Sequence, residues 1–371
     1  MNSLALERGI ASVVATAENA SSGQDLFRHV SERLRRVVPF DGSAWFGIDP
    51  STLLAAAPAR VENVEAGHCD SFWTREMTVE DVLLFRDVAR SASGIGTLHH
   101  ATDACPARSA RHREFLAPQG YDDELRAAFR VGSRTWGVVS LYRERGRDSF
   151  SPRDAEVVRQ VGSAIAVALR GFATSSVMSS PDADSPGTAL YDISGRLLSF
   201  DDQAHRWLTE IAGADWRNIT PALTPVVAVV ARAPMVAAGR ERGPASTRVQ
   251  APSGRWVYVQ ASCLSMPDGS AGPIAVTIGP AKSSQIAPII VEAYGLTARE
   301  QQITQAVSRG MTNQDIAAAL HLSPHTVRDH LKAIFGKLDV GTRGELVAKL
   351  FAEHYAPTLH AVDPADSHAQ F

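Results

Sequence analysis

The residues best suited to a specific chemistry lie on one face of a helix predicted to begin at Ser323. Successive helical residues are about 100° apart, which gathers apolar side chains into one buried sector: Val327, Leu331, Ile334, Phe335 and Leu338. The opposite sector presents hydrogen-bonding groups and no large apolar group: His325, Arg328, Asp329, Lys332 and Gly336, flanked by Thr326 and Lys337. A helix fits the major groove of B-DNA, where Arg and Lys donate to guanine and a carboxylate accepts from cytosine. A solvated surface helix has the same pattern, so this helix alone leaves both interpretations open.

The flanking sequence predicts a unit of four short helices, because four hydroxyl residues stand at positions typical of helix caps: Thr297, Thr312, Ser323 and Thr342. Glu300 and Glu345 fit the capping box with Thr297 and Thr342, and Asp315 is a near match with Thr312. Pro324 follows Ser323 at the first helical position, where a missing N–H costs nothing.

The ends of these helices predict how they cross. Gly310 ends the first helix and Gly341 separates the last two. Only His321 and Leu322 join the second helix to the third, so these helices must cross steeply. That arrangement is a helix-turn-helix.

The whole segment resembles the LuxR-type helix-turn-helix of bacterial transcription regulators. The residues that carry the resemblance are Leu296-Thr297-x-Arg299-Glu300, Gly310-x-Thr312-Asn313-x-x-Ile316-Ala317-x-x-Leu320, Ser323-x-x-Thr326-Val327-x-x-His330 and Ile334-x-x-Lys337-Leu338-x-Val340. The resemblance implies a DNA-binding domain over residues 295–354. It also implies base contacts by residues on the exposed face of the third helix: Arg328, Asp329 and Lys332, with His325 beside them. Contacts to the phosphate backbone are expected from Thr326, Lys337, Asn313 and Arg343.

Two features depart from the usual pattern of that family. Gly336 replaces a residue that is mostly polar or basic, and it lowers helix propensity by about 1 kcal/mol relative to Ala. Residues 296–354 hold seven Arg or Lys against six Asp or Glu, so the unit is not strongly basic. We therefore expect affinity to depend on local placement of charge and on dimerisation.

Composition bounds the rest of the chain. A length of 371 residues suggests two or three domains, and 44% hydrophobic residues with a net charge of −3 indicate a soluble globular protein. The acidic net charge excludes a protein that binds nucleic acid non-specifically over its whole surface, but it allows a small domain that recognises a specific DNA sequence. Three distant cysteines, Cys69, Cys105 and Cys263, fit neither a disulfide framework nor a zinc site. We expect a cytoplasmic protein.

Neither the N-terminus nor the longest apolar region predicts a membrane protein. Glu7 and Arg8 interrupt the N-terminus before a short apolar run, which argues against a signal peptide. The longest apolar region, 223–238, is broken by Pro225, Arg232 and Pro234. It is expected to be a core helix rather than a membrane span.

The first half alternates helices and strands. After an amphipathic helix within 1–22 come a helix over 22–38, a strand over 43–48, paired strands over 125–142 and a closing helix capped by Ser151. Residues 23–172 resemble the GAF domain, most clearly at Gly137-Val138-Val139 and at Phe150-Ser151-x-x-Asp154. The resemblance implies a sensory pocket lined by residues 60–122, although the lining residues stay unknown. His68-Cys69, His99-His100 and Cys105 lack metal-ligand spacing, so no cofactor or metal is expected.

The second half begins with a linker over 173–186, rich in Ser, Pro and Asp. Residues 187–281 then predict two short strands, a helix and a three-stranded meander, an order that resembles a PAS domain. A second sensor, a dimerisation module and a structural spacer all remain open for it. A connector over 282–294 leads to the helix-turn-helix, and the tail 355–371 is expected to be disordered.

These observations predict a multidomain α+β protein with a C-terminal all-α domain of four helices. We expect a sequence-specific transcription regulator that binds double-stranded promoter DNA as a homodimer, responds to an unknown small-molecule effector and is not an enzyme. RNA polymerase is a further candidate partner, and no membrane contact is expected. A signalling adaptor with a vestigial helix-turn-helix is the alternative.

Overall fold

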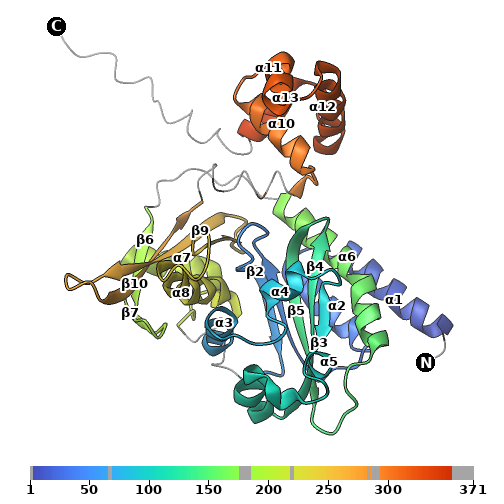
Figure 1. Cartoon of the computed structure of the whole chain (residues 1–371), viewed down its shortest axis with the longest axis vertical. Helices are drawn as coiled ribbons and strands as arrows, with labels where there is room; N and C mark the ends of the chain where they lie inside the picture. The colour runs from blue at the N-terminus through green and yellow to red at the C-terminus, as the bar shows by residue number, and fades with distance from the viewer. Residues whose placement is uncertain are drawn as a thin grey trace. The chain divides into compact units, whose positions relative to one another are not determined.

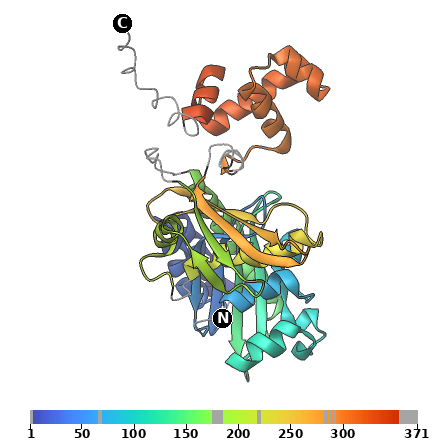
Figure 2. The same cartoon turned by 90° about the vertical axis from the view of Figure 1, so that its left-hand side faces the viewer.

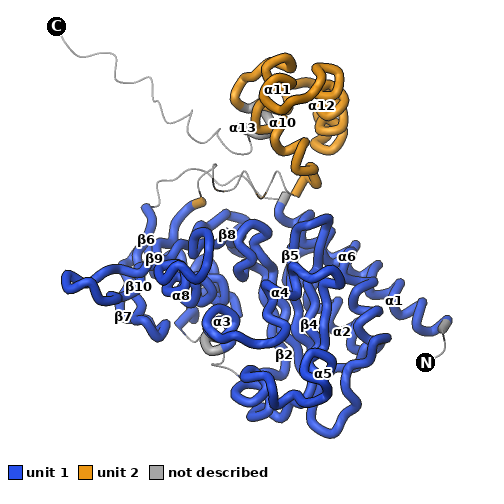
Figure 3. The backbone as a smooth tube through the Cα atoms, in the orientation of Figure 1, with its two compact units in different colours: residues 1–175, 185–280 blue, residues 176–184, 281–371 orange. Residues whose placement is uncertain are grey.

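The computed structural model describes residues 3–65, 69–174, 185–217, 221–281, 285, 289 and 293–352. The chain divides into two compact units, shown in different colours in Figure 3. Unit 1 comprises residues 1–175 and 185–280, and unit 2 comprises 176–184 and 281–371. Most of the predicted linker and connector, and the predicted tail, lie outside the described residues.

The first module of unit 1 is a five-stranded antiparallel sheet in the order β2-β1-β5-β4-β3. Its strands are β1 (Gly42–Ile48), β2 (Ala55–Glu62), β3 (Ile95–Thr97), β4 (Tyr121–Val131) and β5 (Arg134–Glu144). The predicted strands at 43–48 and 125–142 are confirmed, and the last two turn at Gly132, whose φ of 59° suits glycine. The edge strand β2 was not predicted, because its alternation is interrupted by Pro58.

Helices cover both faces of this sheet. One face carries α1 (Ser3–Glu18), α2 (Gly23–Leu34) and α6 (Pro152–Thr174), which lie side by side in Figure 1. The other face carries the short helices α3 (Cys69–Thr78), α4 (Phe85–Arg90) and α5 (Leu98–Ala101), followed by two 3₁₀ turns, Pro106–Arg108 and Ala117–Gln119, on either side of a π-helical turn, His112–Leu116. In α1, Val13 is buried as expected, but Leu4 is 57% exposed and contributes nothing to the predicted apolar face.

The second module of unit 1 is another antiparallel sheet, in the order β7-β6-β10-β9-β8. Its elements are β6 (Gly187–Tyr191), β7 (Leu197–Phe200), α7 (Asp202–Ala212), α8 (Thr224–Ala237), β8 (Ser246–Gln250), β9 (Trp256–Ser265) and β10 (Ala271–Pro280). The predicted order of strands and helix is confirmed, and α8 is the expected core helix over 223–238. The likeness to a PAS domain stays a prediction.

The two modules share one hydrophobic core, which the sequence did not predict. Helix α8 packs on α3, and the edge strand β8 lies beside the edge strand β2. At this joint Arg248 Nε lies 2.8 Å from Asp49 Oδ2, with both side chains buried, and Thr247 Oγ1 donates to the carbonyl of Ala55 at 2.9 Å. Unit 1 is therefore one body built from two sheets.

Unit 2 consists of α10 (Ala298–Ser308), α11 (Asn313–Leu320), α12 (Pro324–Leu338) and α13 (Arg343–Ala352). The four predicted caps are in place: the side chain of each hydroxyl residue accepts from a backbone N–H three residues later. Thr312 and Asp315 form a complete capping box rather than a near match. Gly341 separates α12 from α13 as expected, and Asp339 follows α12 in the left-handed conformation, with φ 51°.

Among the described residues, every helix is too short or too polar to cross a membrane.

Candidate nucleic-acid interface

The apolar face of α12 holds this helix in the small core of unit 2. Val327, Ile334 and Leu338 are at most 1% exposed and Leu331 is 6% exposed. They pack in one cluster with apolar side chains of the other helices: Ile303, Val307, Ile316, Ala317 and Leu346. The rotation of α12 about its axis is thereby fixed, and its opposite face must point to solvent.

The start of α12 is fixed by its cap. Ser323 Oγ accepts from the backbone N–H of Thr326 at 3.0 Å and lies 2.8 Å from Thr326 Oγ1. His321 ends α11 in the left-handed conformation, with φ 52°, so the chain turns sharply between α11 and α12. The predicted helix-turn-helix geometry is confirmed. Its first helical turn carries the partial positive charge of a helix N-terminus, which favours a nearby phosphate, although Pro324 has no N–H and Ser323 accepts the N–H groups of Thr326 and Val327.

The four predicted base-contacting residues all lie exposed on α12: His325, Arg328, Asp329 and Lys332. Among the described residues, Arg328 and Lys332 have no hydrogen-bond or ion-pair partner. His325 Nδ1 lies 3.0 Å from Asp329 Oδ2, one helical turn away, and both side chains are mostly exposed. The face thus offers two free cations and one carboxylate that has a local partner.

The predicted phosphate contacts differ from the base-contacting residues because most have partners inside unit 2. Lys337 Nζ donates to Glu300 Oε2 at 2.6 Å and to the carbonyl of Gly295 at 3.2 Å. Arg343 Nη1 donates to Asn313 Oδ1 at 3.1 Å, and Arg343 Nη2 donates to the carbonyl of Met311. These bonds hold helices together, so the structure gives the three side chains a role that the sequence did not predict.

Glu300 connects two of these roles. Its carboxylate accepts from the backbone of Thr297 at 2.6 Å, as the capping box requires, and from Lys337. Burial would raise the pKa of Glu300, but the hydrogen bonds from Lys337 and Thr297 outweigh it, so the pKa is lowered. The cap can be found from the local sequence. Its ion pair with a residue 37 positions later cannot.

A second polar cluster lies in unit 1, between β4 and the helices over it. Arg126 is fully buried and donates to Glu124 Oε1 at 2.8 Å and to Glu76 on α3. Arg111 Nε donates to Glu124 Oε2 at 2.8 Å and Arg111 N donates to Asp81 Oδ2 at 2.7 Å. The guanidinium of Arg126 also lies over the ring of Phe85, 4.3 Å from its centroid. Five charged residues therefore share one buried network.

The electrostatics of this cluster favour the charged forms of Glu124 and Arg126. Burial would raise the pKa of Glu124, but the positive charges of Arg111 and Arg126 outweigh it and lower the pKa to about 2. Burial likewise opposes the charge of Arg126, but the charges of Glu124 and Glu76 outweigh it and raise its pKa. The cluster is a paired structural network rather than a source of protons for catalysis.

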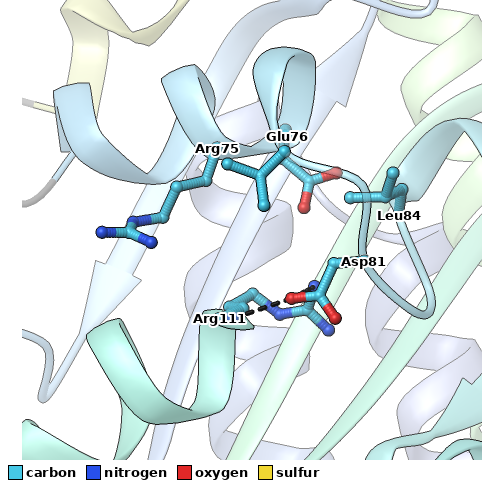
Figure 4. A pocket seen from close by; sticks show the side chains of 6 residues that line it. Arg75, Glu76, Asp81, Leu84 and Arg111 are labelled. Carbon is cyan, nitrogen blue, oxygen red and sulfur yellow. Dashed lines mark hydrogen bonds and ion pairs between the residues drawn. The ribbon is translucent and has the colours of Figure 1, made fainter. Parts of the chain in front are cut away.

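A small cavity lies beside this network (Figure 4). Its volume is about 10 Å³, and it is lined by Arg75, Glu76, Val79, Asp81, Leu84 and Arg111. That volume suits about one water molecule. It falls within the predicted pocket region 60–122, but it does not identify an effector pocket.

Comparison with known families assigns two parts of the chain. Residues 295–350 match the profile described as "Bacterial regulatory proteins, luxR family", and residues 22–169 match the GAF domain. The chain therefore contains a LuxR-type helix-turn-helix domain and a GAF domain, as the sequence predicted. The second sheet module, residues 187–280, lies outside both matches.

Individual relatives match short segments of the chain. The transcriptional regulatory protein ComA of Bacillus subtilis (strain 168) is 50% identical over 68 residues, which cover 18% of this chain and 29% of ComA. The monoamine regulon transcriptional regulator of Klebsiella aerogenes is 42% identical over 65 residues, covering 18% and 29%. The chain thus spans less than a third of the length of either relative. Among solved structures, the GAF domain of an Acinetobacter phosphoenolpyruvate-protein phosphotransferase matches at 14% identity and a TM-score of 0.33, covering 48% of this chain and all of that domain.

Proposed function

We propose that this protein, which carries a LuxR-type helix-turn-helix domain and a GAF domain, is a sequence-specific transcription regulator. The observation that carries the proposal is the placement of α12 within the LuxR-type match: its apolar face is buried, and Arg328 and Lys332 project without partners. Free cations on an exposed helix at the end of a sharp turn suit the major groove. Its matched relatives carry the names of transcriptional regulators.

In this proposal the residues on α12 make different contacts with DNA. Arg328 and Lys332 donate to base edges, with guanine O6 and N7 the favoured acceptors. Asp329 accepts from cytosine N4, and His325 holds its carboxylate through the contact of 3.0 Å. On the flank, Thr326 and the N-terminal turn of α12 approach the phosphates.

We further propose that Lys337, Asn313 and Arg343 act mainly by fixing the helices that present α12. About a third of the Lys337 side chain is exposed to solvent, so its ammonium can also contact a phosphate. Each of these residues positions the interface even where it also touches DNA.

The GAF domain is proposed to couple a signal to promoter binding. The effector's identity, its pocket and any contact with RNA polymerase are left open by this proposal. A homodimer is expected, because two recognition helices meet successive major grooves when half-site centres lie about 10–10.5 base pairs apart.

Selection of bound duplexes from a random library by the full chain tests the proposal. We expect an enriched two-fold motif, and Arg328→Ala should lose preference at one base pair per half-site, about 1–3 kcal/mol each. Arg309→Ala is a matched control, because Arg309 is an exposed arginine of the same domain that is not on α12. Enrichment of the same motif by Arg328→Ala would contradict the assigned role. A failure to enrich any sequence would leave two explanations, a helix-turn-helix that binds DNA only once its effector is bound or an adaptor with a vestigial one, and the same selection with the isolated C-terminal fragment would separate them.

A further inference from the structure

Three arginines come together where the two sheet modules of unit 1 join. Arg86 and Arg90 lie one turn apart on α4 of the first module, and Arg232 lies on α8 of the second. Figure 2 views unit 1 from the side of the second module, which lies in front of the first. The loop after α8 adds one carboxylate, Glu241, and the three side chains form an arginine cluster around it.

Glu241 is the carboxylate that the arginine cluster shares. Its Oε1 lies 3.3 Å from Arg86 Nη1, and its Oε2 lies 3.8 Å from Arg232 Nη2. Among the residues that the structure describes, Arg90 makes no side-chain hydrogen bond or ion pair, and Asp87, also on α4, pairs with none of the three arginines. Three positive charges therefore face one negative charge, and two positive charges remain uncompensated.

The most buried member of the cluster is Arg232, of which only 9% is exposed. Its Nη1 and Nη2 donate to the carbonyls of Thr52 and Arg242 at 2.7 and 2.8 Å, whereas its buried Nε has no hydrogen-bond partner within the described part of the chain. Burial lowers the pKa of Arg232, the charge of Glu241 opposes this only in part, and the charge of Arg90 lowers the pKa further. An added anion would stabilise a buried cation of this kind.

We propose that the arginine cluster binds a small molecule that carries a phosphate monoester. Such a group has a charge of about −1.5 to −2 near pH 7 and presents three acceptor oxygens, so it matches the uncompensated charge. A carboxylate brings one charge and two oxygens, and a phosphodiester of DNA also brings one charge. Either would leave the cluster only half compensated. Guanidinium groups are also the side chains best shaped for phosphate.

The three arginines differ in what they contribute. Arg90 is exposed and unpaired among the described residues, so its guanidinium can donate two parallel N–H groups to one phosphate. Arg86 offers the donors that Glu241 does not accept. Arg232 contributes mainly charge, because both of its terminal nitrogens already donate to carbonyls. Since these residues come from α4 and α8, a bound phosphate would join the two modules, whatever α12 does with DNA.

Calorimetric titration of the full chain with phenyl phosphate tests the inference. Wild type should show saturable binding, and Arg90→Met should raise the dissociation constant at least about tenfold. Arg206→Met is the matched control and should leave the constant unchanged, because Arg206 is an exposed arginine of α7 without a partner among the described residues. Benzoate has the same ring but a single charge, so wild type should bind it at least about tenfold more weakly than phenyl phosphate.

Two further measurements separate binding from folding. Glu241→Gln should bind phenyl phosphate more tightly than wild type, since the anion no longer competes with a carboxylate for the cluster. Without phosphate, Arg90→Met should not lower the urea midpoint of tryptophan fluorescence, because Arg90 opposes the charge of Arg232. Phenyl phosphate should raise that midpoint more in wild type than in Arg90→Met.

Absence of saturable binding to wild type would overturn the inference, and so would equal losses for Arg90→Met and Arg206→Met. Equal binding of benzoate and phenyl phosphate would overturn the assignment of a phosphate. If Arg90→Met weakened only the binding of a scrambled duplex, the cluster would contact the DNA backbone rather than a small phosphorylated molecule. None of these outcomes bears on whether Arg328 reads bases, which the selection of duplexes decides separately.

Discussion

At the scale of single residues, Gly336 is a position where a substitution can stabilise α12 without a clash with neighbouring side chains. A Cβ atom added at Gly336 meets nothing within 4 Å, and the position lies inside the helix. Gly336→Ala should therefore stabilise unit 2 by about 1 kcal/mol. Slower amide hydrogen exchange in α12 peptides of the full chain would show this gain.

Gly310 provides the opposite case as a control. It follows α10 with φ 79°, a conformation that costs other residues about 1–2 kcal/mol. Gly310→Ala should accelerate exchange in the same domain even though its Cβ meets nothing within 4 Å. If both substitutions changed exchange in the same direction, backbone conformation would not explain either.

Arg126 is the residue on which the buried network of unit 1 depends. Its removal leaves Glu124 and Glu76 buried with too little positive charge, which typically costs about 3–5 kcal/mol. Arg126→Met should lower the urea midpoint of tryptophan fluorescence strongly. All six tryptophans lie in unit 1, so this signal reports that unit alone. Arg159→Met, which breaks an exposed pair with Glu156, should leave the midpoint nearly unchanged.

The pKa of Glu124 predicts how unit 1 responds to acid. In the folded protein this pKa is lowered from 4.5 to about 2, so the folded state binds a proton less readily than the unfolded state. The stabilisation from the charged form is complete above pH 4.5 and is lost as the pH falls from 4.5 toward 2. The difference in urea midpoint between wild type and Glu124→Gln should shrink over that range. A difference that grows with acidity would contradict the assignment.

At the scale of elements, the ion pair between Lys337 and Glu300 ties α12 to α10. Lys337→Met should accelerate hydrogen exchange in both helices, because Glu300 loses its partner while only 6% of its side chain is exposed. Lys332→Met removes the same charge from an exposed position of α12 without a described partner, so exchange should stay unchanged. Both variants should weaken DNA binding. Only the first should loosen the domain.

Elements were predictable where their signals are local. The caps at Thr297, Thr312 and Ser323 and the apolar period of α12 are written within a few residues of one another, and the structure follows them. Strand β2 was missed because it is an edge strand rich in alanine and interrupted by Pro58. The residue that ends α12 has no clear sequence signal, because an aspartate, Asp339, adopts the left-handed conformation that glycine usually provides.

At the scale of the whole molecule, sequence patterns did not predict how the modules of unit 1 join. The pair Arg248 and Asp49 lies 199 positions apart, and the contact of α8 with α3 has no local signature. Residue types limit which side chains can pair, but only the fold brings these two together. The exposed side chains of α12 were predictable for the opposite reason, since each stands opposite a buried stripe on the same helix.

The central claim is that α12 reads base sequence, and the ratio of two affinities tests it most directly. The full chain should bind its selected duplex much more tightly than a scrambled duplex of equal length in anisotropy titrations at about 150 mM salt. Arg328→Ala should reduce that ratio by about 5- to 150-fold per contacted base pair, whereas Arg309→Ala should leave it unchanged. If wild type bound both duplexes equally, or if Arg328→Ala kept the full ratio, α12 would not be the reading element.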